Sequence, residues 1–261
     1  MSTETRFIKP LPLSSALLYF AIPALVFVFS VYYLIPYFRQ QGITEFMSYS
    51  LSLLIPLIFM LVASLIALRM EGYPLTWDSI KQRFRLQRMN RTDWIWTGIS
   101  LLIMLVGAGI FGVLGQMLVT QGIIPLPDKI PTALLDPTID PANLLNVFMS
   151  ALGPNVRGNW GLVLFMLVLL FFNIVGEEFW WRGLILPRQE LTHGKNTWLT
   201  HGTLWAFFHI FKYWSVIGLL PVCLALTYVA QRRQNTWPGI INHFIINGLG
   251  LIPLIALVLG S

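Results

Sequence analysis

Residues 161–183 read GLVLFMLVLLFFNIVGEEFWWRG, an almost unbroken apolar run that ends beside two adjacent glutamates, Glu177 and Glu178. The apolar part is long enough to cross the hydrocarbon core of a bilayer as a helix. Each ionised carboxylate placed in that core costs about 2.5–3.5 kcal/mol on insertion scales. The two acids are therefore expected either to be paired structurally or to do chemistry.

The composition of the chain extends this interpretation to the whole protein. Of its 261 residues, 56% are hydrophobic and only 11% are charged, whereas ordinary globular proteins carry about 25% charged residues. We predict an all-α polytopic membrane protein, a bundle of about seven transmembrane helices surrounded by membrane lipids. The formal charge of +6 could suggest a nucleic-acid partner. Most basic residues fall in short loops between apolar runs, so no nucleic-acid partner is expected.

Seven apolar segments are candidate spans, and they lie near residues 15–38, 47–69, 94–118, 160–181, 198–213, 216–231 and 237–259. The fifth and sixth are short and could instead form one broken helix pair. Residues 1–14 are predicted to be a cytoplasmic N-terminal tail, and residues 15–261 a single transmembrane helical domain. Six prolines between residues 122 and 159 indicate a long connection outside the membrane, with room for short helical turns.

The distribution of Lys and Arg tests this map. With the N-terminus in the cytoplasm, 13 basic residues fall on the inner side, as the positive-inside rule requires, and 4 fall on the outer side, namely Arg39, Lys129, Arg157 and Lys212. Five of the 13 lie between Lys81 and Arg91. This loop is interpreted mainly as a topology determinant, and alternatively as a binding site for anionic lipid headgroups. The predicted location is the cell (inner) membrane, as a multi-pass protein.

Polar and ionisable residues gather in three of the candidate spans. They are Glu177, Glu178, Arg182, His201, His209, Asn242, His243 and Asn247. Glu178 and Arg182 are four residues apart, so they lie on one helix face and can pair. Glu177 is rotated by about 100° from Glu178 and has no cation at that spacing. It is therefore the candidate general base or acid, although both acids could instead be structural.

The histidines and asparagines differ in how strongly they suggest function. His209 lies among aromatic residues at the same membrane depth as the acids, which favours a functional role. His201 is closer to the cytoplasmic end, where an interfacial role is favoured. His243 and Asn247 share a helix face and could direct N–H donors to one point, as an oxyanion hole requires. The alternative is a hydrogen bond between spans. Asn242 is a weak candidate.

Several intramembrane chemistries lack their motifs in this chain. There is no H-E-x-x-H helix, no Gly-x-Ser-x-Gly nucleophile elbow, and no pair of aspartates within the predicted spans. We assign no metal and expect no cofactor to be required. If the site is metal-dependent, Glu177, His209 and His243 have the ligand types that suit zinc. A proton-coupled transporter is disfavoured because the chain does not divide into two related halves.

Three ordered motifs resemble a known family. They are Glu-Glu-x3-Arg at Glu177, Glu178 and Arg182, aromatic-x3-His at Trp205 and His209, and His-x3-Asn at His243 and Asn247. The pattern resembles the CPBP family of intramembrane endopeptidases, which comprises the CAAX-prenyl-protease-type (type II, Abi) and bacteriocin-processing-type proteins. The resemblance covers about residues 160–250. Trp205 stands where the family usually has Phe, which is a conservative aromatic change.

The resemblance implies roles for four of these residues in peptide hydrolysis. Glu177 and His209 would activate the attacking water. His243 and Asn247 would stabilise the tetrahedral oxyanion. The resemblance also implies a metal-independent glutamate protease, although the family was long described as metalloproteases.

The resemblance gives the remaining two motif residues, Glu178 and Arg182, a supporting role. The expected function is that of an intramembrane endopeptidase that hydrolyses a peptide bond of a membrane-associated peptide or protein, with CAAX-type processing as one form. The alternative is a non-catalytic immunity or scaffold membrane protein of the same fold.

Overall fold

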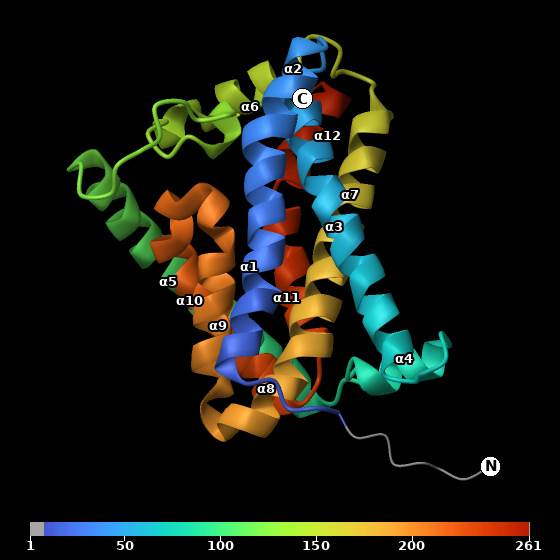
Figure 1. Cartoon of the computed structure of the whole chain (residues 1–261). Coiled ribbons are helices and arrows are strands. Elements are labelled where there is room, and N and C mark those ends of the chain that lie inside the picture. Colours follow the sequence, from blue (N-terminus) through green and yellow to red (C-terminus); the bar gives the residue numbers. More distant parts are fainter. Residues whose placement is uncertain (1–7, 261) are drawn as a thin grey trace.

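The computed structural model describes residues 8–260, so residues 1–7 of the predicted N-terminal tail lie outside the described residues. Within the described range the regular structure is helical and contains no strand. The helices pack side by side into one bundle (Figure 1). The predicted all-α class is therefore confirmed.

The first half of the chain supplies three long helical stretches. Their elements are α1 (Leu13–Phe29), a π-helical turn η1 (Ser30–Leu34), α2 (Ile35–Gln40), α3 (Glu45–Met70), α4 (Trp77–Arg83) and α5 (Arg91–Thr120). Local sequence fixes where the longest helices begin. The Thr44 side chain accepts a hydrogen bond from the third residue of α3, and Asn90 forms a reciprocal capping box with Asp93 at the start of α5. These helices lie within a few residues of the spans predicted from hydropathy.

The second half is more broken. Its principal helices are α6 (Leu144–Leu152), α7 (Trp160–Glu178), α8 (Leu186–His193), α9 (Thr197–Phe208), α10 (Val216–Arg233), α11 (Trp237–Gly248) and α12 (Leu251–Leu259). A π-helical turn, η4 (Phe179–Ile185), joins α7 to α8. The 3₁₀ segments are η2 (Ala133–Leu135), η3 (Pro141–Asn143), η5 (Gly194–Asn196) and η6 (His209–Ser215). The proline-rich connection thus contains α6 and short helical turns, as expected.

By length and composition, four helical stretches in the described part of the chain could cross a membrane. They are Leu13–Gln40, Glu45–Met70, Arg91–Thr120 and the continuous helical run Trp160–Arg233, which itself folds into several helices. A fifth candidate is the pair Trp237–Gly248 and Leu251–Leu259, which is bent by 44° at its break. Several spans are therefore supported, and the count of seven remains a prediction.

The α9–α10 hairpin is the main departure from the predicted map. A span was expected near 198–213, but α9 has only 12 residues. At 1.5 Å per residue it measures about 18 Å, against about 30 Å for the hydrocarbon core. Figure 1 shows α9 and α10 reaching only part of the height of α1 and α3. Because α9 ends early, His209 lies inside the bundle, not at its edge.

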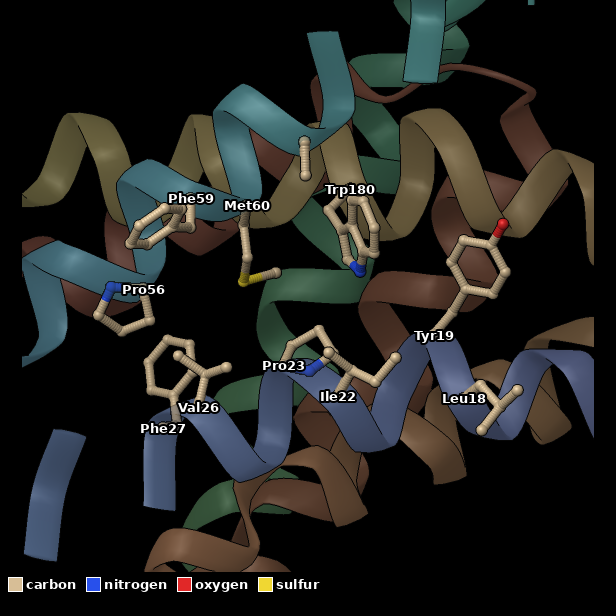
Figure 2. A pocket seen from close by; sticks show the side chains of 11 residues that line it. Leu18, Tyr19, Ile22, Pro23, Val26, Phe27, Pro56, Phe59, Met60 and Trp180 are labelled. Atoms are coloured by element: carbon tan, nitrogen blue, oxygen red, sulfur yellow. The ribbon is translucent and has the colours of Figure 1, made fainter. Parts of the chain in front are cut away.

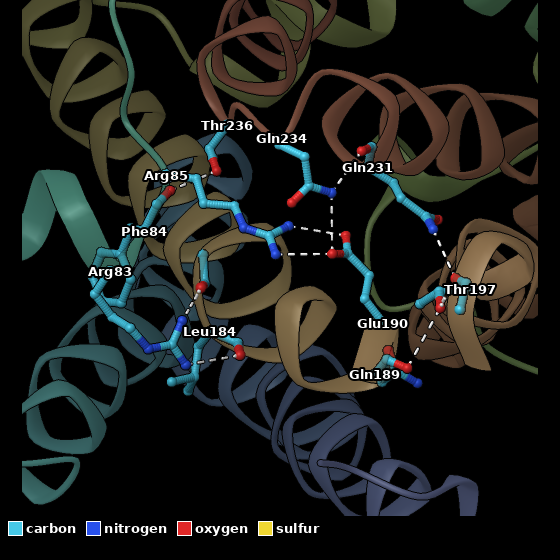
Figure 3. A network of polar contacts seen from close by, with 12 residues as sticks. Arg83, Phe84, Arg85, Leu184, Gln189, Glu190, Thr197, Gln231, Gln234 and Thr236 are labelled. Atoms are coloured by element: carbon cyan, nitrogen blue, oxygen red, sulfur yellow. Dashed lines mark hydrogen bonds and ion pairs between the residues drawn. The ribbon is translucent and has the colours of Figure 1, made fainter. Parts of the chain in front are cut away.

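The basic segment between Lys81 and Arg91 is partly structural. Arg83 is buried, and it donates to the carbonyls of Gly183 (2.7 Å) and Leu184 (3.3 Å) in η4. It also pairs with Glu71 at 2.9 Å. The contacts of Arg83 with η4 belong to the polar network of Figure 3. This arginine therefore ties α4 to η4 and is not available to lipid headgroups.

Arg85 makes a similar connection. Its guanidinium pairs with both carboxylate oxygens of Glu190, on α8, at 2.9 and 2.8 Å, as Figure 3 shows. A bidentate pair of this kind adds geometric specificity as well as energy. Arg83 and Arg85 are two of the five basic residues that were interpreted mainly as topology determinants. They thus also hold α4 and the following loop against η4 and α8.

Close helix contacts and one surface groove shape the middle of the bundle. A Cβ added at Gly176 would lie 2.8 Å from the carbonyl oxygen of Leu57, so this glycine permits α7 to approach α3 closely. Between α1 and α3, an apolar groove of about 390 Å³ lies beside Trp180 (Figure 2). Phe27 lines this groove and also the central cavity described below. A single phenylalanine side chain therefore contributes to the wall between them.

Candidate active site

A cavity of about 380 Å³ lies among α1, α3, α5, α7, α9, α10 and α11. Most of its wall is apolar. The polar and ionisable side chains that line it are Asn173, Glu177, His209, Lys212, His243 and Asn247, together with Tyr49. The four candidate catalytic residues, which come from the helices α7 and α11 and the 3₁₀ segment η6, thus face one space.

Glu177 occupies the last turn of α7 and is 4% exposed. Asn173 Nδ2 donates to its Oε1 at 2.8 Å. The indole nitrogens of Trp181 and Trp205 donate to its Oε2 at 3.3 and 3.1 Å. No cation in the described part of the chain lies within ion-pair distance of this carboxylate. Three neutral donors therefore orient Glu177 without neutralising it, which agrees with its prediction as the acid that lacks a paired cation.

The second acid, Glu178, is completely buried and pairs with Arg182 at 3.1 Å. The pairing predicted from their four-residue spacing is confirmed. His243 Nδ1 lies 2.9 Å from the same oxygen, Glu178 Oε1. The guanidinium of Arg182 also lies over the face of Trp205. Glu178 and Arg182 thus hold together η4, α9 and α11 directly beneath the cavity wall.

His209 begins η6, directly after α9 ends at Phe208. Its Nδ1 lies 2.9 Å from the backbone carbonyl oxygen of Trp205. A carbonyl only accepts hydrogen bonds, so this contact assigns the proton to Nδ1 and leaves the lone pair on Nε2. The ring therefore presents a hydrogen-bond acceptor through its second nitrogen.

Asn247 and Glu177 are connected through a residue that the sequence did not single out. Asn247 Nδ2 donates to Asn173 Oδ1 at 2.6 Å, and Asn173 Nδ2 in turn donates to Glu177. Asn173 lies four residues before Glu177, on the same face of α7. The only signal that could have identified it is its position as a lone amide within an apolar helix.

Two weaker candidates lie outside the cavity. His201 is completely buried, contrary to the interfacial position that was favoured, and its Nδ1 lies 2.6 Å from Gln189 Oε1. Asn242 donates to the Thr97 carbonyl (3.1 Å) and to Ser100 Oγ (2.7 Å) on α5. Both side chains make contacts between helices, and neither lines the cavity.

The possible zinc ligands do not fit a metal site in this arrangement. In residues 8–260, no group of three or more His, Cys, Asp or Glu side chains is placed to hold a metal ion. Both oxygens of Glu177 accept hydrogen bonds from protein donors. The Nδ1 atoms of His209 and His243 face protein acceptors, so only their Nε2 atoms are open to a further ligand. The described residues thus offer no preformed site for a metal ion.

Residues 159–249 match the family model described as type II CAAX prenyl endopeptidase Rce1-like. The resemblance to the CPBP family is confirmed. The matched segment runs from the start of α7 to the end of α11 and contains all three motifs. No curated protein and no solved structure gives a significant match. The match supports a membrane protease in general terms, and it does not distinguish between catalytic types.

Proposed function

We propose that this protein is an intramembrane endopeptidase that hydrolyses a peptide bond of a membrane-associated peptide or protein. One observation carries the proposal: Glu177 and His209 line the same cavity inside an apolar helical bundle. A buried carboxylate held by neutral donors is suited to accept a proton. The family match over residues 159–249 supports the same reaction class.

In the proposed reaction a water molecule lies between Glu177 and His209. Glu177 takes one proton, and Nε2 of His209 accepts a hydrogen bond from the other. The resulting hydroxide attacks the peptide carbonyl carbon and forms a tetrahedral oxyanion. Glu177 then delivers its proton to the departing amine as the C–N bond breaks, so that a carboxylic acid and an amine are produced.

His243 and Asn247 are suited to stabilise the oxyanion by donating hydrogen bonds. Since His243 Nδ1 faces Glu178, a donor toward the cavity has to be the Nε2–H group. A ring that donates through both nitrogens carries both protons, and Glu178 would then share its negative charge between this ring and Arg182. Asn247 has two amide hydrogens, of which one is donated to Asn173 and the other is free to reach the oxyanion.

The proposal includes an arrangement in the membrane. The protein would enter the cell (inner) membrane with seven helical segments and its N-terminus in the cytoplasm, and α9 and α10 would form a hairpin that crosses only part of the bilayer. In Figure 1, α4, α8 and the start of α1 lie at one end of the bundle, and α2, α6 and α12 lie at the other. This distribution is consistent with alternating spans. Membrane lipids and a membrane-associated peptide or protein are the proposed partners, and the reaction as proposed requires no cofactor.

The test uses the full chain reconstituted in liposomes and a library of membrane-anchored peptides, with cleavage detected by mass spectrometry. Glu177→Gln and His209→Ala should each lower cleavage by about 100-fold or more. Asp78→Asn, at an exposed carboxylate, and His193→Ala, at the end of α8, are the matched controls and should retain activity. Addition of a chelator should have no effect.

Full activity in Glu177→Gln would refute the proposed mechanism. If wild-type protein cleaves no peptide and Glu177→Gln still complements the cellular phenotype of a deletion strain, the protein is an immunity or scaffold protein of the same fold.

A further inference from the structure

The catalytic cavity contains a lysine to which the three motifs give no role. Lys212 lies three residues after His209, in η6, and lines the cavity together with Glu177. The seven-span map placed it in a connection on the outer side. The structure also places it in the connection between α9 and α10, where it is half-buried and faces the cavity, because the two helices meet within the bundle (Figure 1).

Lys212 differs from the well-buried arginines of this protein. Arg83 and Arg182, which are both buried, each pair with an acid, as does the partly exposed Arg233. Within the described residues Lys212 has no ion pair. Its Nζ lies 5.7 Å from the centroid of the Phe211 ring. An ammonium group in a largely apolar cavity is costly without a countercharge. An anion that enters this cavity would therefore be bound favourably beside Lys212.

The backbone holds Lys212 firmly in this position. Its φ of −137° and ψ of 55° interrupt the helical geometry of η6. Two following residues are tied to the outer connection: Tyr213 Oη donates to the Pro125 carbonyl at 2.6 Å, and Trp214 Nε1 donates to the Leu135 carbonyl at 3.0 Å. A lysine anchored in this way is prearranged for a ligand, because little ordering of the backbone remains to be done on binding.

Among the described residues, Glu177 is the only acid that lines the cavity, and it lies beyond ion-pair distance of Lys212. An ion pair between the two would also withdraw the carboxylate from its proposed role as a base. The countercharge for Lys212 is therefore best supplied from outside the protein, by the molecule that occupies the cavity.

We propose that Lys212 forms a subsite for a carboxylate of the substrate, supplied either by the C-terminus or by an acidic side chain. This inference rests on the proposed endopeptidase function, which it deepens by naming a substrate class. Since Lys212 and Glu177 share one cavity, the carboxylate lies within a few residues of the scissile bond. Lys212 acts as a specificity-determining residue and takes no part in the chemical step.

The experiment measures binding and cleavage separately. The probes are three N-dodecanoyl pentapeptides built from alanine, valine and leucine. The first ends in a free carboxylate, the second ends in a carboxamide, and the third is a carboxamide with glutamate at its central position. Binding to liposome-reconstituted Glu177→Gln protein is compared with binding to the same protein that also carries Lys212→Met. Lys195→Met, at an exposed lysine, is the matched control.

We expect at least one carboxylate peptide to bind about tenfold or more tightly than the uncharged carboxamide, equivalent to about 1.4 kcal/mol. Lys212→Met should abolish this preference, Lys195→Met should retain it, and Lys212→Arg should restore most of it. The peptide that carries the preference identifies the source of the carboxylate. Equal binding of all three peptides, absence of binding, or a preference that survives Lys212→Met would each overturn the subsite.

Cleavage assays with Glu177 restored separate this proposal from the general one. If the carboxylate preference depends on Lys212 but no peptide is cleaved under any condition, the subsite stands and the endopeptidase function fails. If peptides are cleaved with equal kcat/KM regardless of charge, the endopeptidase function stands and the subsite fails.

Discussion

The guanidinium carbon of Arg182 lies 3.5 Å from the centre of the Trp205 ring, over its face. The edge of the same indole donates its N–H to Glu177 at 3.1 Å. One side chain therefore contacts both the ion-paired arginine and the acid proposed as the base. A phenylalanine at this position, which is usual in the family, could provide the aromatic face but not the N–H donor. The substitution appeared conservative in the sequence, but it changes the hydrogen bonding of Glu177.

Trp205→Phe should separate the two contacts. The ring face remains beneath Arg182, so the melting temperature should change little. Loss of one of three donors to Glu177 should lower kcat by about tenfold, equivalent to about 1.4 kcal/mol. Thermal unfolding in detergent and peptide cleavage check the two halves of this prediction. Trp205→Leu, which also removes the cation–π contact, should lower the melting temperature as well.

Arg182→Met should destabilise the fold by about 3–5 kcal/mol, because it leaves Glu178 buried without its cation. Folded yield should therefore fall along with activity. Size-exclusion chromatography and thermal unfolding are the measurements, with Arg232→Met at an exposed position as the control. A variant with normal yield and normal melting temperature would show that the ion pair contributes little to stability.

Gly239→Ala should be damaging although it adds only one methyl group. A Cβ at this position would lie 2.6 Å from Glu178 Oε2, so α11 or the carboxylate would have to shift. His243, four residues further along α11, would move with it. Gly248→Ala lies on the same helix and would meet only the edge of Phe244 at 3.9 Å. We expect the first variant to lose stability and activity and the second to retain both.

Asn173→Ala should lower kcat more than it raises KM. The amide links Asn247 to Glu177 through bonds of 2.6 and 2.8 Å, so its loss disturbs both the proposed base and the proposed oxyanion donor. We expect a loss of about 10- to 100-fold in kcat with normal folding. Steady-state kinetics provide the measurement, and Asn159→Ala at the exposed start of α7 is the control. An unchanged kcat would show that Glu177 does not depend on this hydrogen bond.

Much of the fold could be predicted from the sequence because its signals are local. Long apolar runs end at charged residues, and the observed helices begin and end near those residues. The Glu178–Arg182 pair was also predictable, since a four-residue spacing brings side chains together on one helix. The depth of the α9–α10 hairpin in the bundle could not be predicted from the sequence. Nothing in its hydropathy separates a helix that crosses the membrane from one that turns back beside other helices.

The contacts between elements distant in sequence also escaped prediction. Arg83 was assigned to a loop because basic residues usually mark loops, yet it reaches the carbonyls of η4, one hundred residues away. The role of Trp205 as a donor to Glu177 depends on the close approach of α7 and α9, which hydropathy does not reveal. Hydropathy also does not reveal how deep the connection between α9 and α10 lies in the bundle. For this reason Lys212 was assigned only to a connection on the outer side, and its position in the cavity wall was not predicted.

The π-helical turn η4 begins directly after Glu178 and ends where α8 begins. A π-helical turn accommodates about one residue more than an α-helical turn. Deletion of a single residue here would convert the turn to α-helical geometry and would draw the Gly183 and Leu184 carbonyls away from Arg83. The number of residues in η4 is therefore constrained by the contacts on either side of it. Insertions and deletions should be tolerated in the outer connection between α5 and α7. In the seven residues that follow the two glutamates they should disrupt the structure.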